Sequence, residues 1–403
     1  MTGLSEQTER TEKSFLSEEG KIGGKRRPIH YVFFWAAGIA TLFVWNCMLS
    51  LTGYLKTRIH PTVDDYYGFF FNFGGFIAFF LVDRVERIVS LRYLLMSVPC
   101  VLVAIFTGVY IMAETLEGGE PSYNKLYLFF AIITAAGFTN NLMQTTVIRH
   151  TFKFSYIEVS YYNSGSALAG ILSNAIALVL AYVLDEKEVS KSGLVYLVFL
   201  VITLVIILFV FSKYFASGEA YNQVLQSVYD DGQAAPTFVE TFKLMNSFFF
   251  HMLLLYSICL SIFPAFNFAM GMGSSHPAAA QYLLLTFNVG DFVGKFLYSK
   301  LSLPDGILAH VFSIIRIGFT LFILYMFGGE PHEGLLNQPT ITLSFVALLS
   351  LSNGYLTSAY FSLSSSRVSP KHQSNSGFLM TVGLLLGLTY GSFTVLVGKT
   401  KAN

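Results

Sequence analysis

Charge is scarce in this sequence. Only 12% of the 403 residues are charged, whereas an ordinary soluble domain has about 25%. The formal net charge is +1, and 54% of the residues are hydrophobic. This composition excludes a disordered chain, an ordinary soluble enzyme and a protein that binds nucleic acid through basic charge. We therefore expect no nucleic-acid partner.

Cysteine is also rare. The three cysteines, Cys47, Cys100 and Cys259, lie in apolar stretches and lack the spacing of a metal site. An odd number of cysteines in such stretches gives no disulfide framework, so they are interpreted as small buried hydrophobic residues. The eight histidines are scattered and form no convincing metal or catalytic group. The sequence predicts neither a metal nor a cofactor.

Long apolar runs dominate the rest of the chain. Each is about as long as the roughly 20 residues that an α-helix needs to cross a bilayer. Helices are the expected form, because every backbone N–H in hydrocarbon must bond within its own segment. The predicted spans are 29–55, 66–82, 91–113, 126–148, 159–184, 194–214, 245–271, 279–298, 307–328, 340–360 and 376–398. The predicted fold class is an all-α polytopic membrane protein with eleven transmembrane helices.

The polar segments divide the chain into two bundles of six and five spans. Such halves typically close around a substrate cavity near the midplane of the membrane. The predicted organisation is a disordered cytosolic tail at 1–28, a six-helix bundle at 29–214, a central cytosolic loop at 215–243, a five-helix bundle at 244–398 and an extracellular tail at 399–403. Outside the central loop, fourteen Lys and Arg fall on one side of the membrane and seven on the other. This excess predicts a cytosolic N-terminus and an extracellular C-terminus.

Three charged residues lie deep inside predicted spans: Asp291, Lys295 and Arg316. Each costs about 2.5–3.5 kcal/mol at a helix centre, so such residues normally face a cavity or a partner. Asn288, Asp291 and Lys295 share one helix face. They either bind a polyhydroxyl ligand or form an ion pair that fixes helix packing, and we favour ligand binding. For Arg316 we favour a structural or gating role.

Gly290 and Gly294 share another face of the same predicted helix, which suits close helix contact. The small residues from Asn163 to Gly170 in the fifth predicted span are likewise expected to pack against a neighbouring helix.

Uncharged polar residues mark two other spans. Asn140, Asn141 and Gln144 lie among apolar residues of the fourth span, where an amide can address the edge of a heterocyclic base or join helices. Trp45 lies mid-span next to Asn46, where the indole either stacks on a ligand ring or packs. The charged segment 83–87 after the second span either forms salt bridges that close an inner gate or is a solvated loop.

Together these segments resemble the equilibrative nucleoside transporter family. The resemblance covers about 30–398 and depends on several motifs that occur in the same order as in that family. They are Trp45-Asn46, Gln144, Ser164-Gly165 with Leu168-Ala169-Gly170, Phe287-Asn288 through Asp291 and Gly294, Arg316, and Ser352-Asn353-Gly354-Tyr355-Leu356. The chain departs from the family pattern at Lys295, where the family usually has Arg, at Val44, where many members have Pro, and at Asn140, where some have Gly. It looks like a divergent member, of a kind expected in a unicellular eukaryote.

The resemblance implies a major-facilitator-like fold and a carrier that moves nucleosides, or nucleobases, by alternating access. It implies that Trp45 and Gln144 contact the nucleoside, and that Asp291 addresses the sugar with help from Lys295. Asn288 completes the predicted binding set, and the secondary set is Leu49, Asn140, Asn141 and Arg316. The partners are then a small-molecule nucleoside and the lipid bilayer, in the plasma membrane, and the oligomeric state stays open.

Other functions remain open at this stage. A sugar or organic-cation carrier of the same architecture would use Asp291 to attract a cation, and a proton-driven nucleoside carrier would titrate it. An intramembrane enzyme would need an acid–base or metal constellation, and a receptor would usually have seven spans. We therefore expect a transporter and no enzyme.

Overall fold

The computed structural model describes residues 28–154, 156–184, 189–217, 236–269, 279–301, 306–327 and 339–400. The predicted N-terminal tail, most of the central loop and the last residues of the C-terminal tail lie outside these ranges. Helix covers both edges of the predicted central loop, because the helix before it ends at Ser217 and the next begins at Phe238. The predicted domain boundaries stay predictions.

The described residues are helical almost throughout. The first part contains α2 (Pro28–Ser50), the short α3 (Thr52–Arg58), α4 (Val63–Ile88), α5 (Leu91–Thr115), the 3₁₀ turn η1 (Leu116–Gly119), α6 (Tyr123–Thr151), α7 (Tyr156–Val183) and α8 (Val189–Ser217). The second part contains α10 (Phe238–Ala269), α11 (Ala279–Lys300), α12 (Gly306–Phe327), α13 (Pro339–Ser366) and α14 (Pro370–Thr400).

Nine helices in the described ranges are long and apolar enough to cross a membrane. Of the other long helices, α11 carries Asp291, Lys295 and Lys300, and α12 is apolar over its shorter stretch Gly306–Leu321. The all-helical membrane fold is thus confirmed, whereas the count of eleven spans stays a prediction.

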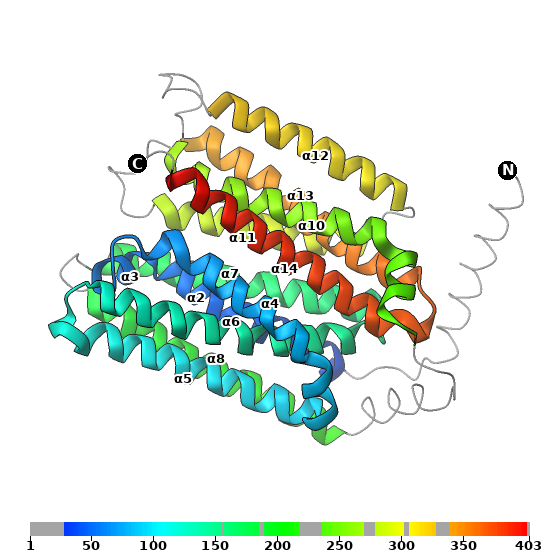
Figure 1. Cartoon of the computed structure of the whole chain (residues 1–403), viewed down its shortest axis with the longest axis horizontal. Coiled ribbons are helices and arrows are strands. Elements are labelled where there is room, and N and C mark those ends of the chain that lie inside the picture. The colour runs from blue at the N-terminus through cyan, green and yellow to red at the C-terminus, as the bar shows by residue number, and fades with distance from the viewer. Residues whose placement is uncertain are drawn as a thin grey trace, which may run out of the picture.

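The helices lie side by side in two groups (Figure 1). Helices α2 to α8 pack mainly with one another, through α2 on α7 and α4 on α6. Helices α10 to α14 form the second group, through α11 on α13 and α10 on α14. The groups meet where α7 contacts α11 and α13, and where α14 contacts α4 and α6. We call α2 to α8 the first group and α10 to α14 the second group.

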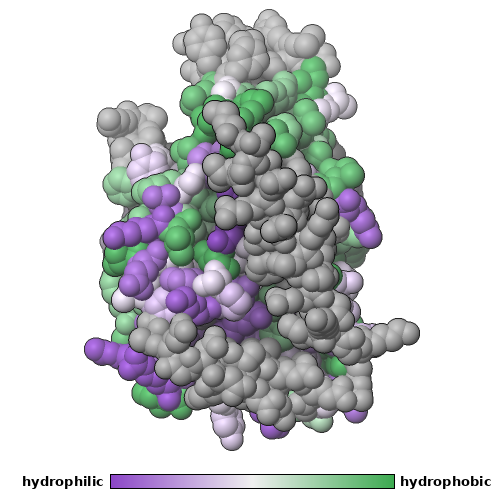
Figure 2. Space-filling view, turned by 90° about the vertical axis from the view of Figure 1, so that its right-hand side faces the viewer, coloured by the Kyte–Doolittle hydropathy of each residue, from purple (hydrophilic) through white to green (hydrophobic). Residues whose placement is uncertain are grey.

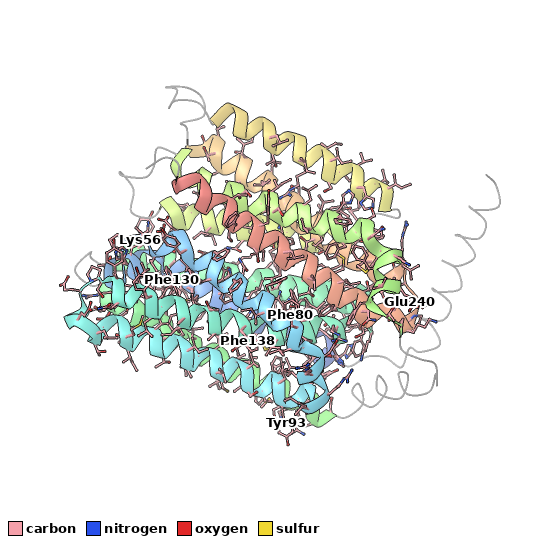
Figure 3. The ribbon with its side chains drawn as sticks, viewed as in Figure 1. Lys56, Phe80, Tyr93, Phe130, Phe138 and Glu240 are labelled. Atoms are coloured by element: carbon pink, nitrogen blue, oxygen red, sulfur yellow. The ribbon has the colours of Figure 1, made fainter. Side chains whose placement is uncertain are left out.

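The surface and the ends of the molecule differ in character. Val198, Ile202, Val205 and Phe209 form an exposed apolar stripe along α8, as expected of a helix face in contact with lipid. Lys56 and Glu240 lie at opposite ends of the stack (Figure 3). We call the end where α2 begins the proximal end and the opposite end the distal end. On the proximal end, hydrophilic residues gather in one part of the described surface (Figure 2).

Glycine allows α4 and α6 to pack with their backbones in contact. A Cβ added at Gly137 would overlap with the carbonyl group of Phe71, and one added at Gly74 would overlap with that of Thr134. Because two positions along the same pair of helices require glycine, this contact fixes the register of α4 against α6.

Candidate functional site

The predicted acid–base pair forms between successive turns of α11. Lys295 Nζ lies 2.7 Å from Asp291 Oδ2, and both side chains are more than nine-tenths buried. The pair satisfies the i, i+4 geometry expected from the sequence. Its burial is unusual, because two charges leave water only where neighbouring groups compensate the loss of solvation.

The pair extends into a network across three helices. Asn353 of α13 donates from Nδ2 to Asp291 Oδ1 at 2.8 Å. Arg316 of α12 donates to Asn353 Oδ1 at 3.4 Å and to Ser352 Oγ at 3.1 Å. Arg316 also donates to the carbonyl oxygen of Leu255 in α10, at 3.4 Å. These contacts fit the structural role that we favoured for Arg316.

Close backbone contact holds this network in register. A Cβ added at Gly354 of α13 would overlap with the carbonyl group of Asp291, and one at Gly294 would overlap with that of Leu351. A Cβ added at Gly290 would overlap with the side-chain hydroxyl of Ser350 in α13. The expectation that Gly290 and Gly294 mediate close helix contact is therefore confirmed, and α13 is the helix that they contact.

Two contacts link this part of α11 to the first group. Lys295 Nζ reaches Ser166 Oγ of α7 at 3.5 Å. Asn288 donates to the carbonyl oxygen of Leu284 at 2.8 Å, and its side chain fills the space that a Cβ on Gly170 would need. The charged pair therefore lies where the two groups meet. The small residues of the fifth predicted span pack as expected, since Gly165 also has no room for a Cβ beside Trp35.

Trp45 and Gln144 both lie in the first group, but they have different neighbours. Trp45 stacks on Phe71 at a ring-centroid distance of 4.3 Å and lies 5.6 Å from Tyr67. Gln144 is buried and bonds the Tyr162 hydroxyl of α7. Leu49, one turn beyond Trp45 on α2, is partly buried.

The side-chain amides of Asn140 and Asn141 differ in their hydrogen bonding. Asn141 donates to the carbonyl oxygen of Gly137 at 2.9 Å and packs against Gly75 of α4. Asn140 is 1% exposed, and neither atom of its amide has a partner within the described part of the chain. An unpaired buried polar group costs about 1–3 kcal/mol. Asn140 therefore has hydrogen-bonding capacity that water or a ligand would satisfy.

Contacts between the groups occur at both ends of the stack. At the proximal end, Arg149 of α6 lies 2.6 Å from Asp83 and 3.0 Å from Glu86, both of α4. It also donates to Ser374 of α14 at 3.3 Å. At the distal end, the hydroxyls of Tyr182 in α7 and Tyr282 in α11 lie 2.5 Å apart.

The proximal contacts bear on the segment 83–87. Its acidic residues form ion pairs as one interpretation proposed, but they belong to the last turns of α4 and not to a loop. Phe152 reinforces the contact, because its ring lies 5.7 Å from that of Phe361 in α13.

Several buried polar residues here were not selected from the sequence. Asn353 entered only as part of a motif, and its bond to Asp291 depends on how α11 and α13 pack. His30 of α2 lies 3.0 Å from Glu158 of α7, which is 0% exposed. Lys125, also buried, donates to the carbonyl oxygens of Arg58 and Ala113. Polar residues near span ends gave no signal in the sequence, because such residues are usually solvated.

Comparison with known proteins identifies relatives for most of the chain. A sequence model described as nucleoside transporter matches residues 226–398. Equilibrative nucleotide transporter 1 of Arabidopsis thaliana is 22% identical over 389 residues, which cover 90% of this chain and 84% of that protein. The chain is thus similar, at low identity, to equilibrative nucleoside and nucleotide transporters. Human equilibrative nucleoside transporter 2 is 30% identical over 151 residues, but this match spans only 33% of that protein and 35% of this chain.

The fold agrees with this family. The crystal structure of the human organic anion transporter MFSD10 (TETRAN) superposes with a TM-score of 0.59, covering 92% of this chain and 94% of that one at 14% identity. The expected major-facilitator-like fold is thus confirmed. The chain is an integral membrane protein, and the proteins that it resembles in sequence and in fold are membrane transporters and not enzymes.

Proposed function

We propose that this protein carries nucleosides, or nucleobases, across the plasma membrane by facilitative alternating access. The observation that carries the proposal is the buried Asp291–Lys295 pair at the contact between the two helix groups. A rocking carrier needs its binding groups at such a contact, because each group then exposes them to one side in turn. The equilibrative relatives support nucleosides as the cargo.

The two helix groups supply different chemistry to the cargo. Trp45 offers a flat indole face to the base, and Gln144 offers a donor and an acceptor to its edge. Asp291 accepts from sugar hydroxyls, Lys295 donates to them, and Asn288 adds an amide on the same face. Leu49, Asn140 and Asn141 are secondary contacts, whereas Arg316 holds Asn353 in place.

We assign the proximal end to the cytosol, with the N-terminus inside and the C-terminus outside. The excess of Lys and Arg on that side supports this orientation. In the proposed division, the bundles 29–214 and 244–398 rock about the central loop 215–243. The contacts of Arg149 and Phe152 then close the cytosolic side in the present conformation.

Uptake by purified protein in proteoliposomes tests this function. We expect saturable uptake of labelled adenosine, competition by unlabelled nucleosides, and no loss of uptake when an ionophore collapses the pH gradient. Gln144→Leu should lower uptake at least tenfold. Thr139→Val on the same helix should not, because the Thr139 hydroxyl bonds the carbonyl oxygen of Ala135 within α6.

Each alternative has its own outcome in this assay. Competition by a hexose or a monoamine but not by nucleosides would contradict the proposed cargo. Loss of uptake with the ionophore would contradict the facilitative mechanism and indicate proton coupling.

A further inference from the structure

The buried network around Asp291 has more positive than negative charge. Lys295 and Arg316 each carry one positive charge, and both are about 5% exposed. Asp291 is the one carboxylate that pairs with this network in the described part of the chain. The hydrogen-bond partners of Arg316 are Ser352, Asn353, the Cys259 thiol and a backbone carbonyl group, none of which is a carboxylate. One formal positive charge is thus buried without a counter-charge, which is costly unless an anion compensates it.

Two buried donors in the same region lack partners. Asn163 Nδ2 of α7 and Ser358 Oγ of α13 make no hydrogen bond to any described residue. Asn163 is 3% exposed and Ser358 is 0% exposed. Leaving each of them unpaired costs about 1–3 kcal/mol, so both have capacity for an acceptor that the described chain does not supply.

Asn163 lies on the face of α7 that meets α11. Ser166, three residues later, donates to the carbonyl oxygen of Asn163 and accepts the contact from Lys295. Gly170, seven residues after Asn163, packs against Asn288 of α11. Residues spaced in this way share one helix face. Asn163 therefore lies one turn from the Lys295 contact, toward the proximal end.

Ser358 approaches the same place from α13. Helices α11 and α13 run in the same direction and keep their register, since Gly290 packs against Ser350 and Gly354 against Asp291. One turn beyond Asp291 is Lys295, and one turn beyond Gly354 is Ser358. The same register that joins Gly354 to Asp291 thus brings Ser358 beside Lys295.

We propose that Lys295, Asn163 and Ser358 form a subsite for an anion. Such a subsite combines an ammonium, an amide N–H and a hydroxyl, and a bound anion would both accept their hydrogen bonds and balance the surplus charge. The anion is either an inorganic ion such as chloride or an anionic group of the cargo, such as a phosphate monoester. The second source rests on the proposed function, whereas the first does not.

Thermal unfolding of the purified full-length protein tests for an inorganic ion. The melting temperature is measured in sodium chloride and in sodium gluconate at equal ionic strength. We expect chloride to raise it in a saturable manner, because a ligand that binds only the folded state stabilises it by mass action. Asn163→Leu and Ser358→Ala should abolish this rise. Ser344→Ala should keep it, because Ser344 is an exposed residue of α13 whose hydroxyl bonds the carbonyl oxygen of Thr340.

Ser358→Ala separates an anion site from a packing role. In gluconate the variant should be at least as stable as the wild type, because it removes an unpaired buried hydroxyl. If the hydroxyl only packs, the variant has the same stability deficit in both salts, which contradicts the proposal.

Competition for adenosine uptake into proteoliposomes tests whether the bound anion is a group of the cargo. Adenosine monophosphate should inhibit the uptake of labelled adenosine, and Ser358→Ala should raise its inhibition constant at least tenfold while changing competition by unlabelled adenosine less than threefold. A response to chloride alone assigns the site to the inorganic ion, and a response to the monophosphate alone assigns it to the cargo. A response to neither overturns the subsite. Absence of adenosine uptake by the wild type would instead defeat the proposed function and leave the thermal experiment valid.

Discussion

Asp291→Asn is the substitution that tests the buried network most directly. The carboxylate accepts from Lys295 at 2.7 Å and from Asn353 at 2.8 Å. A neutral amide in its place would leave Lys295 and Arg316 as two buried cations without a carboxylate among the described network residues. Removing one partner of a buried ion pair costs about 3–5 kcal/mol. We expect the free energy of unfolding to fall by that amount.

A second substitution distinguishes charge imbalance from loss of binding. Asp291→Asn combined with Lys295→Gln returns the network to the wild-type net charge, with Arg316 as its one cation. We expect the double variant to be more stable than the Asp291→Asn protein, with a coupling of about 2 kcal/mol, within the range for residues in contact. Adenosine uptake should be lost in both variants, because both lack the carboxylate.

The assay combines denaturant unfolding in detergent micelles with uptake by proteoliposomes at matched protein content. Two results would refute the reasoning. One is an Asp291→Asn protein that unfolds and transports like the wild type. The other is a double variant no more stable than Asp291→Asn, which would mean that the two charges do not interact.

Two further predictions concern packing and closure. Gly354→Ala should lower the melting temperature markedly, because its new Cβ overlaps with the carbonyl group of Asp291. Gly318→Ala is the control and should not lower it, since a Cβ at Gly318 meets nothing within 4 Å. Equal melting temperatures of the two variants would contradict the close contact between α11 and α13. Arg149→Gln removes two ion pairs at the proximal end. The variant should increase the labelling of a cysteine placed at Ser374 by a thiol reagent added on the cytosolic side. Unchanged labelling would argue against a role of Arg149 in closing the cytosolic side.

The helices were predictable because their cause is local. Runs of about 20 apolar residues form helices in hydrocarbon, because every backbone N–H and C=O group must find its hydrogen-bond partner within the same segment. The predicted limits agree with the structure to within several residues at most ends. The largest differences are at polar ends, as where α4 continues through Asp83 and Glu86 to Ile88. A charged last turn of a helix and a charged loop look alike in sequence.

The candidate site was predictable only where its contacts lie within one helix. Spacing alone places Asp291 one turn from Lys295. It does not connect Asp291 to Asn353, which is 62 residues away in the chain, or Lys295 to Ser166, which is 129 residues away. Those partners depend on the register of α11 against α13 and α7, which several glycines set together.

The sequence by itself thus determined the membrane setting, the helices and the residues too costly to leave in lipid, since each follows from hydropathy and short-range spacing. Only the tertiary structure decided which of those residues meet, which donors remain unpaired and which end of the stack is tied by Arg149. Contacts between distant segments depend on backbone approach and on the balance of charge in a shared interior, and neither property belongs to any single stretch of the chain.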